Sequence, residues 1–118
     1  MKKILFTIVF AYSFLSNAQQ IDFVEYDLSN GLHVILHQDN RAPVITTSVL
    51  YHVGSKDEEE NRTGFAHFFE HLLFEGTENI ESGEWFKIVE ANGGSNNAYT
   101  TDDSTYYYEV FPSNKLEL

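Results

Sequence analysis

Cysteine is absent from this chain of 118 residues. The absence excludes a disulfide framework and a metal site built on thiolates, since both need cysteine side chains. It also excludes the attachment of a lipid anchor to cysteine. Histidine and carboxylate side chains are therefore the only strong ligands that the chain can offer to zinc.

Basic residues are scarce. Seven lysines and arginines stand against 18 aspartates and glutamates, which gives a formal net charge of −11. Such a surface repels nucleic acid and anionic membranes through long-range electrostatics. We therefore expect no nucleic-acid partner, and a weak preference for neutral or basic peptides.

No apolar run in the chain reaches the length of about 20 residues that a membrane-spanning helix needs. The longest run, Ile4 to Leu15, follows Lys2-Lys3 and precedes Ser16-Asn17-Ala18. A basic start, a short apolar stretch and small residues at a cleavage point are typical of a secretory signal peptide. We expect residues 1–18 to be removed and the remainder to be secreted or periplasmic, without a stable membrane span. An uncleaved anchor is the alternative.

The patterning of apolar residues predicts an α+β fold, with an antiparallel β-sheet packed against helices. Strands are expected where apolar and polar residues alternate between turn residues, over residues 24–28, 32–36, 44–53, 96–101 and 105–111. Two amphipathic helices are expected over residues 63–76 and 82–92, with Thr63 and Ser82 as N-caps and Gly76 ending the first. These elements mix without a strict βαβ alternation, which favours the α+β class.

The most informative feature is the sequence His67-Phe68-Phe69-Glu70-His71, which has the H-x-x-E-H order of inverted zinc peptidases. Histidines four residues apart stand on one face of a helix, so both imidazoles can bind one Zn²⁺ ion. Glu70 falls on the same face, where it can take a proton from water that the metal has acidified to a pKa of about 7. The alternative is an ordinary solvated helix face, because a motif this short also arises by chance.

The run Gly64–Thr77, which contains this motif, resembles the active-site helix of the pitrilysin/insulysin-type metallopeptidases. Other segments are similar to further elements of that family, in the family's order: residues 31–34, 53–58, 93–102 and 105–108. The resemblance covers residues 22–118. It implies a zinc-dependent endopeptidase in which His67 and His71 hold Zn²⁺ and Glu70 is the catalytic base.

The resemblance also implies what the chain would need from elsewhere. In this family the third zinc ligand is a glutamate farther downstream than Leu118, and further substrate-contacting residues lie in a second homologous half. We therefore expect residues 19–118 to be the N-terminal part of a zinc metallopeptidase domain, inactive alone, with a second peptidase-like half or subunit as partner. A further helix is expected to begin at Pro112. Within the chain, Glu75, Glu78, Glu81 and Glu84 could each be proposed as the third ligand, and Glu75, four residues after His71 on the same predicted helix, could approach the metal. A solvated acidic face is the favoured interpretation of these four residues.

Asn97 and Ala98 are expected to bind substrate. The stretch Asn97–Thr100 is similar to an edge strand near the zinc in the family, to which an extended peptide adds by backbone hydrogen bonds. An ordinary strand after a Gly-Gly turn is the alternative. A different class of function, a non-catalytic subunit or peptide-binding module, stays open beside the peptidase, although the intact motif argues against it.

Overall fold

The computed structural model describes residues 20–117. The expected signal peptide, residues 1–18, lies outside this range. Within the range, no helix is long and apolar enough to cross a membrane. The described chain divides into two units, residues 20–40 and residues 41–117.

The first unit is a β-hairpin. β1 (Val24–Asp27) pairs antiparallel with β2 (His33–Leu36), with Val24 opposite Leu36. The turn between them needs Gly31, whose φ of 88° lies in the left-handed region that glycine adopts without steric cost. The hairpin expected from the sequence is confirmed.

The second unit is built on a three-stranded antiparallel sheet in the order β3-β5-β4. Its strands are β3 (Val44–Tyr51), β4 (Ser95–Thr100) and β5 (Thr105–Pro112). The central strand, β5, pairs with β3 along its whole length and with β4 over residues 105–110. Among the described residues, β3 and β4 are therefore the two edges of this sheet.

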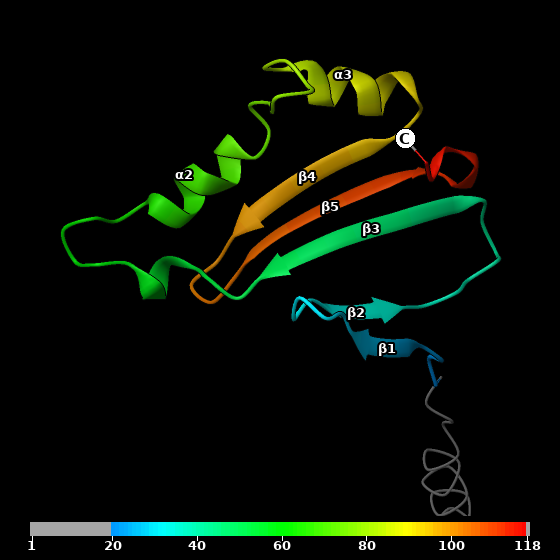
Figure 1. Ribbon diagram of the computed structural model, residues 1–118, viewed down its shortest axis with the longest axis horizontal. Coiled ribbons are helices and arrows are strands. Elements are labelled where there is room, and N and C mark those ends of the chain that lie inside the picture. The colour runs from blue at the N-terminus through cyan, green and yellow to red at the C-terminus, as the bar shows by residue number, and fades with distance from the viewer. Residues whose placement is uncertain (1–19, 118) are drawn as a thin grey trace, which may run out of the picture. The chain divides into compact units, whose positions relative to one another are not determined.

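Two helices, α2 (Phe65–Leu72) and α3 (Glu84–Ala91), lie beside β4 (Figure 1). Both helices contact β4, and α2 also contacts β5. Two short 3₁₀ turns, η2 (Ser55–Asp57) and η3 (Ser113–Lys115), precede α2 and follow β5. The α+β architecture expected from the sequence is thus confirmed. The helix expected from Pro112 is a single 3₁₀ turn within the described residues.

The core between the helices and the sheet is thin. Among the described residues, Ala66 and Val89 are the only apolar side chains that are buried, and each keeps 7–8% of its surface exposed. Phe74 joins the two layers: its ring stacks on Phe86 with 5.1 Å between centroids, and it lies 5.9 Å from the ring of Tyr107. The large apolar side chains of α2 stay exposed, so the described residues cover little of the apolar surface of this helix.

Both helices start one residue later than expected. The expected N-cap of α2 was Thr63, but the N-cap is Gly64, which has a φ of 92° and makes no side-chain capping bond. Likewise, α3 starts after Gly83, with a φ of 72°, rather than after Ser82. In both cases the chain enters the helix through a left-handed residue, a conformation that glycine adopts far more readily than serine or threonine.

Candidate active site

His67 and His71 lie one turn apart on α2, and their rings converge. The Nε2 atoms of the two side chains are 3.0 Å apart, and the ring centroids are 4.7 Å apart. Two nitrogens bound to one tetrahedral zinc ion, each at about 2.0–2.1 Å, lie about 3.3 Å from each other. The pair therefore has nearly the spacing that a shared metal ion requires, although a single N–H···N hydrogen bond between the rings also accounts for it.

Glu70 lies on the buried side of the same helical turn. Its side chain is only 7% exposed, and the Thr100 hydroxyl donates to its Oε2 atom at 2.5 Å. The pKa of Tyr107 is raised, mainly by burial and then by the negative charge of Glu70. The carboxylate is thus oriented by the neighbouring sheet rather than by solvent.

No third metal ligand joins the two histidines, because no group of three His, Asp or Glu side chains among residues 20–117 could hold a metal ion. The helix α2 ends at Leu72 rather than at the expected Gly76, so Glu75 lies beyond it. The Glu75 carboxylate accepts the Ser82 hydroxyl at 2.7 Å and is not brought to the histidines. Two imidazole nitrogens suit Zn²⁺, but a catalytic zinc site has three protein ligands.

Asn97 and Ala98 lie in the edge strand β4, which α2 contacts. Ala98 is half-buried and Asn97 is exposed. The backbone N–H of Ala98 donates to the side-chain oxygen of Asn97 at 2.9 Å, while β5 pairs along one side of the strand, with Tyr107 opposite Ala98. The strand therefore has the unpaired edge that peptide addition requires, and the role of the two residues stays a prediction.

The loop between β3 and α2 holds the start of the helix. Oε2 of Glu58 accepts the Gly64 N–H at 2.7 Å, and Oε1 accepts the Ala66 N–H at 2.8 Å. These two hydrogen bonds hold the pKa of Glu58 below its ordinary value, and the bond from Ala66 has the larger effect. The carboxylate thus supplies the capping expected from Thr63. Sequence reasoning missed it because Glu58 lies six residues before Gly64, outside the local capping patterns.

The same loop is bound to the turn between β4 and β5. The N–H groups of Ser55 and Lys56 donate to the carbonyl oxygens of Thr101 and Asp102, each at 3.0 Å. Gly54 approaches this turn so closely that a Cβ atom there would lie 2.4 Å from both oxygens. The start of α2 is therefore held, through this loop, by the hairpin to which β4 belongs.

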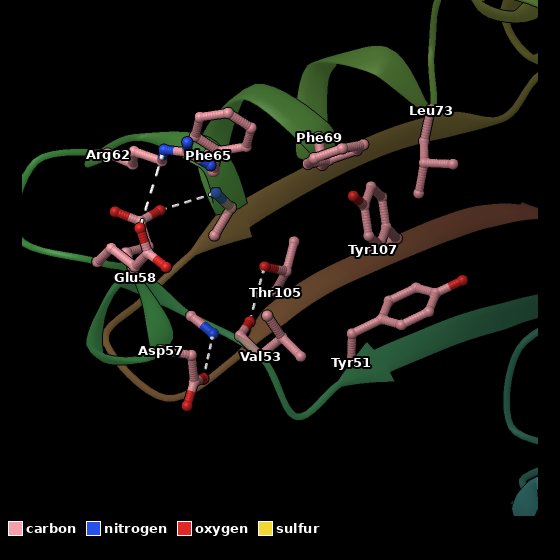
Figure 2. A pocket seen from close by; sticks show the side chains of 13 residues that line it. Tyr51, Val53, Asp57, Glu58, Arg62, Phe65, Phe69, Leu73, Thr105 and Tyr107 are labelled. Carbon is pink, nitrogen blue, oxygen red and sulfur yellow. Dashed lines mark hydrogen bonds and ion pairs between the residues drawn. The ribbon is translucent and has the colours of Figure 1, made fainter.

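A pocket of about 540 Å³ lies between α2 and the sheet (Figure 2). Phe65 and Phe69 line it from α2, Leu73 lines it from the residue that follows this helix, and Tyr51 and Tyr107 line it from β3 and β5. None of the three polar residues of the motif lines this pocket. It is therefore separate from the candidate metal site.

Known proteins resemble the chain over most of its length. The family model described as Insulinase (Peptidase family M16) matches residues 33–118. The zinc protease PqqE of Helicobacter pylori is 45% identical over 82 residues, which cover 69% of this chain and 18% of that protein. Cytochrome b-c1 complex subunit 1 of Homo sapiens is 40% identical over 95 residues, which cover 77% of this chain and 20% of that protein.

A solved structure has the same fold. The crystal structure of a protease from Helicobacter pylori matches with a TM-score of 0.78 and 38% sequence identity, over 83% of this chain and 24% of that chain. The chain thus spans less than a quarter of the length of each of these three relatives.

Proposed function

Because the chain belongs to the insulinase family of peptidases, peptidase family M16, we propose that it forms the zinc-binding part of an exported endopeptidase. The observation that carries this proposal is the convergence of the His67 and His71 Nε2 atoms at 3.0 Å, beside the buried carboxylate of Glu70. The proposal of export rests on the signal-peptide pattern of residues 1–18.

In this proposal, His67 and His71 hold Zn²⁺ through their Nε2 atoms. The remaining protein ligand comes from polypeptide outside residues 20–117 or from a second peptidase-like half or subunit, because no third ligand joins the pair within that range. When bound, the ion supplies Lewis acidity, which polarises a carbonyl group and lowers the pKa of water.

Glu70 acts as the general base. Thr100 engages the Oε2 atom, so Oε1 is the oxygen that accepts a proton from the attacking water. The same carboxyl group then delivers this proton to the amine that leaves when the peptide bond breaks. Burial of the side chain keeps competing solvent away from this transfer.

The substrate is a peptide in extended form, which adds to the unpaired edge of β4 at Asn97 and Ala98. The Ala98 N–H exchanges its bond to the Asn97 side chain for a bond to the peptide. The net charge of −11 favours neutral or basic peptides over acidic ones.

A second candidate function is that of a non-catalytic subunit. One relative, cytochrome b-c1 complex subunit 1, carries the name of a subunit rather than a peptidase, and the described residues supply only two metal ligands. Peptide binding at β4 without hydrolysis would distinguish this function from the first.

The test is made in the full-length polypeptide by measuring zinc content and chelator-sensitive peptide cleavage together. Glu70→Gln keeps both ligands but removes the proton acceptor, so zinc should stay near its wild-type content while activity falls at least about 10²-fold. His71→Ala should lose both. His37 is exposed and lies in the unit of residues 20–40. The control variant His37→Ala should therefore keep both zinc and activity.

The outcomes separate the two candidate functions. A wild-type protein that binds zinc and peptide but shows no chelator-sensitive cleavage is the non-catalytic subunit. Full activity in Glu70→Gln would show that the assigned base is wrong. Loss of zinc from Glu70→Gln as complete as from His71→Ala would make Glu70 a ligand or a support for the ligands.

A further inference from the structure

Thr100 is the last residue of β4, and nothing in the motif points to it. Its hydroxyl donates to Glu70 across 30 positions of sequence, at 2.5 Å. A hydrogen bond from a hydroxyl to a carboxylate oxygen belongs to the stronger class of such bonds. Among the described residues it is the only hydrogen bond found to the Glu70 side chain.

The hydroxyl itself is held in place by the hairpin around it. Threonine is branched at Cβ, so its χ1 angle is restricted once the strand fixes the backbone. Thr100 pairs with Thr105 on β5, and the next residue, Thr101, closes the turn through an N–H bond to the Ser104 carbonyl at 2.8 Å. Thr105 is 6% exposed and donates to the Val53 carbonyl at 3.0 Å. Thr100 is therefore a donor of fixed direction.

Thr100 also lies two residues from Ala98 on the same strand, and both side chains are half-buried on the same side of it. Residues two apart in a strand are separated by about 6.6 Å. The Glu70 carboxylate, which is hydrogen-bonded to Thr100, therefore has a fixed position relative to any peptide that pairs with β4 at Ala98.

We propose that Thr100 is a positioning residue, which fixes the Glu70 carboxylate through Oε2 and places its free oxygen in register with a peptide on β4. The inference rests on the proposed peptidase function and deepens it. In this role Thr100 acts through its hydrogen bond to Glu70 and not by binding the metal ion or the substrate with its side chain. Its loss should therefore slow the chemical step without weakening the binding of zinc or peptide.

The experiment compares three variants of the full-length polypeptide. Thr100→Val removes the hydroxyl and keeps the side-chain shape, and Thr100→Ser restores a donor at the same place. Thr105→Val is the matched control, because Thr105 is the residue that pairs with Thr100 across the two strands. It also loses a buried hydroxyl, but this hydroxyl donates to the Val53 carbonyl and not to Glu70. The measurements are kcat and KM per folded molecule, zinc content and the side-chain rotamer of Glu70 by NMR.

Thr100→Val should lower kcat about 10-fold, a part of the 10²–10⁴-fold that general-base catalysis contributes. KM and zinc content should stay unchanged, and Thr100→Ser should recover most of the rate. The Glu70 side chain should lose its single rotamer in Thr100→Val and keep it in Thr105→Val. Thr105→Val should leave kcat per folded molecule unchanged.

Wild-type kcat in Thr100→Val, or an equal fall of kcat in Thr105→Val, would overturn the inference. Failure of the proposed function looks different, because the wild-type protein would then show no chelator-sensitive cleavage, or Glu70→Gln would retain full activity. In that case the Glu70 rotamer still decides whether Thr100 holds the carboxylate: one fixed rotamer in Thr100→Val would refute the positioning role.

Discussion

The close approach of Gly54 to the β4–β5 turn gives a prediction whose size follows from the structure. In Gly54→Ala, the new Cβ would lie 2.4 Å from the carbonyl oxygens of Thr101 and Asp102, which are backbone atoms that cannot rotate away. The φ of Gly54 is −150°, an extended value that alanine also adopts, so the cost comes from the contact alone. Overpacking of this kind costs about 1–3 kcal/mol.

Relief of the clash requires the loop to separate from the turn. The bonds from the Ser55 and Lys56 N–H groups to that turn, each 3.0 Å long, would then lengthen, at about 1 kcal/mol for each bond lost. Because Glu58 lies in the same loop, the start of α2 would loosen as well. Zinc affinity should therefore fall together with local stability.

Native-state amide hydrogen exchange measures the free energy of this local opening directly. The protection of the Ser55 and Lys56 amides should fall by about 1–3 kcal/mol in Gly54→Ala. Asn61→Ala is the control, since Asn61 is exposed in the same loop and its change should stay within about 0.5 kcal/mol. Unchanged protection of Ser55 and Lys56 in Gly54→Ala would refute the reasoning.

Three further predictions concern pH and export. The pKa of Glu58 is lowered by hydrogen bonds from backbone N–H groups, chiefly that of Ala66. The Glu58 carboxylate therefore stabilises α2 fully above the ordinary glutamate pKa, and this stabilisation is lost as the pH falls through the lowered pKa. Amide exchange of α2 followed through an acid titration should show this loss in the wild type and not in Glu58→Gln. Burial raises the pKa of Glu109, and a hydrogen bond from the Trp85 side chain offsets only part of this rise. The folded state therefore favours the neutral acid, and the protein loses stability as the pH rises from the ordinary glutamate pKa through the raised pKa of Glu109. Glu109→Gln should thus raise the midpoint temperature of unfolding at pH 7 but not at pH 4. N-terminal sequencing of the exported protein should begin at Gln19, and an intact Met1 in the soluble fraction would contradict cleavage.

Local sequence patterns predicted most of the fold because the signals lie within each element. The hairpin of β1 and β2, the three longer strands and both helices all appear in the regions that alternation or helical periodicity predicted, although α2 ends at Leu72 rather than at Gly76. The helix starts were wrong because Thr63 and Ser82 are good capping residues that compete with adjacent glycines. Gly64 and Gly83 are the N-caps because the backbone needs a left-handed φ at these positions. Local sequence patterns do not predict a φ angle.

The candidate site was predictable only as far as its chemistry is local. A spacing of four residues brings His67 and His71 together, because one helical turn does so in any helix. Thr100 and Glu58 carry no such signal. Thr100 meets Glu70 through the crossing of a strand and a helix, and Glu58 reaches α2 across an irregular loop. Contacts of this kind depend on the tertiary fold rather than on neighbouring sequence.

The bond between Asn97 and its own neighbour in the chain bears on self-association. An unpaired strand edge is a template on which a second chain can add, and proteins blunt such edges to avoid aggregation. The Asn97 side chain occupies the Ala98 N–H, a donor that an incoming strand would use, so two copies of this chain gain less by joining their β4 edges. The protection is reversible, since an amide side chain can swing away whereas a proline or a bulge cannot. A strand edge guarded in this way resists accidental pairing but still admits a partner that offers further contacts.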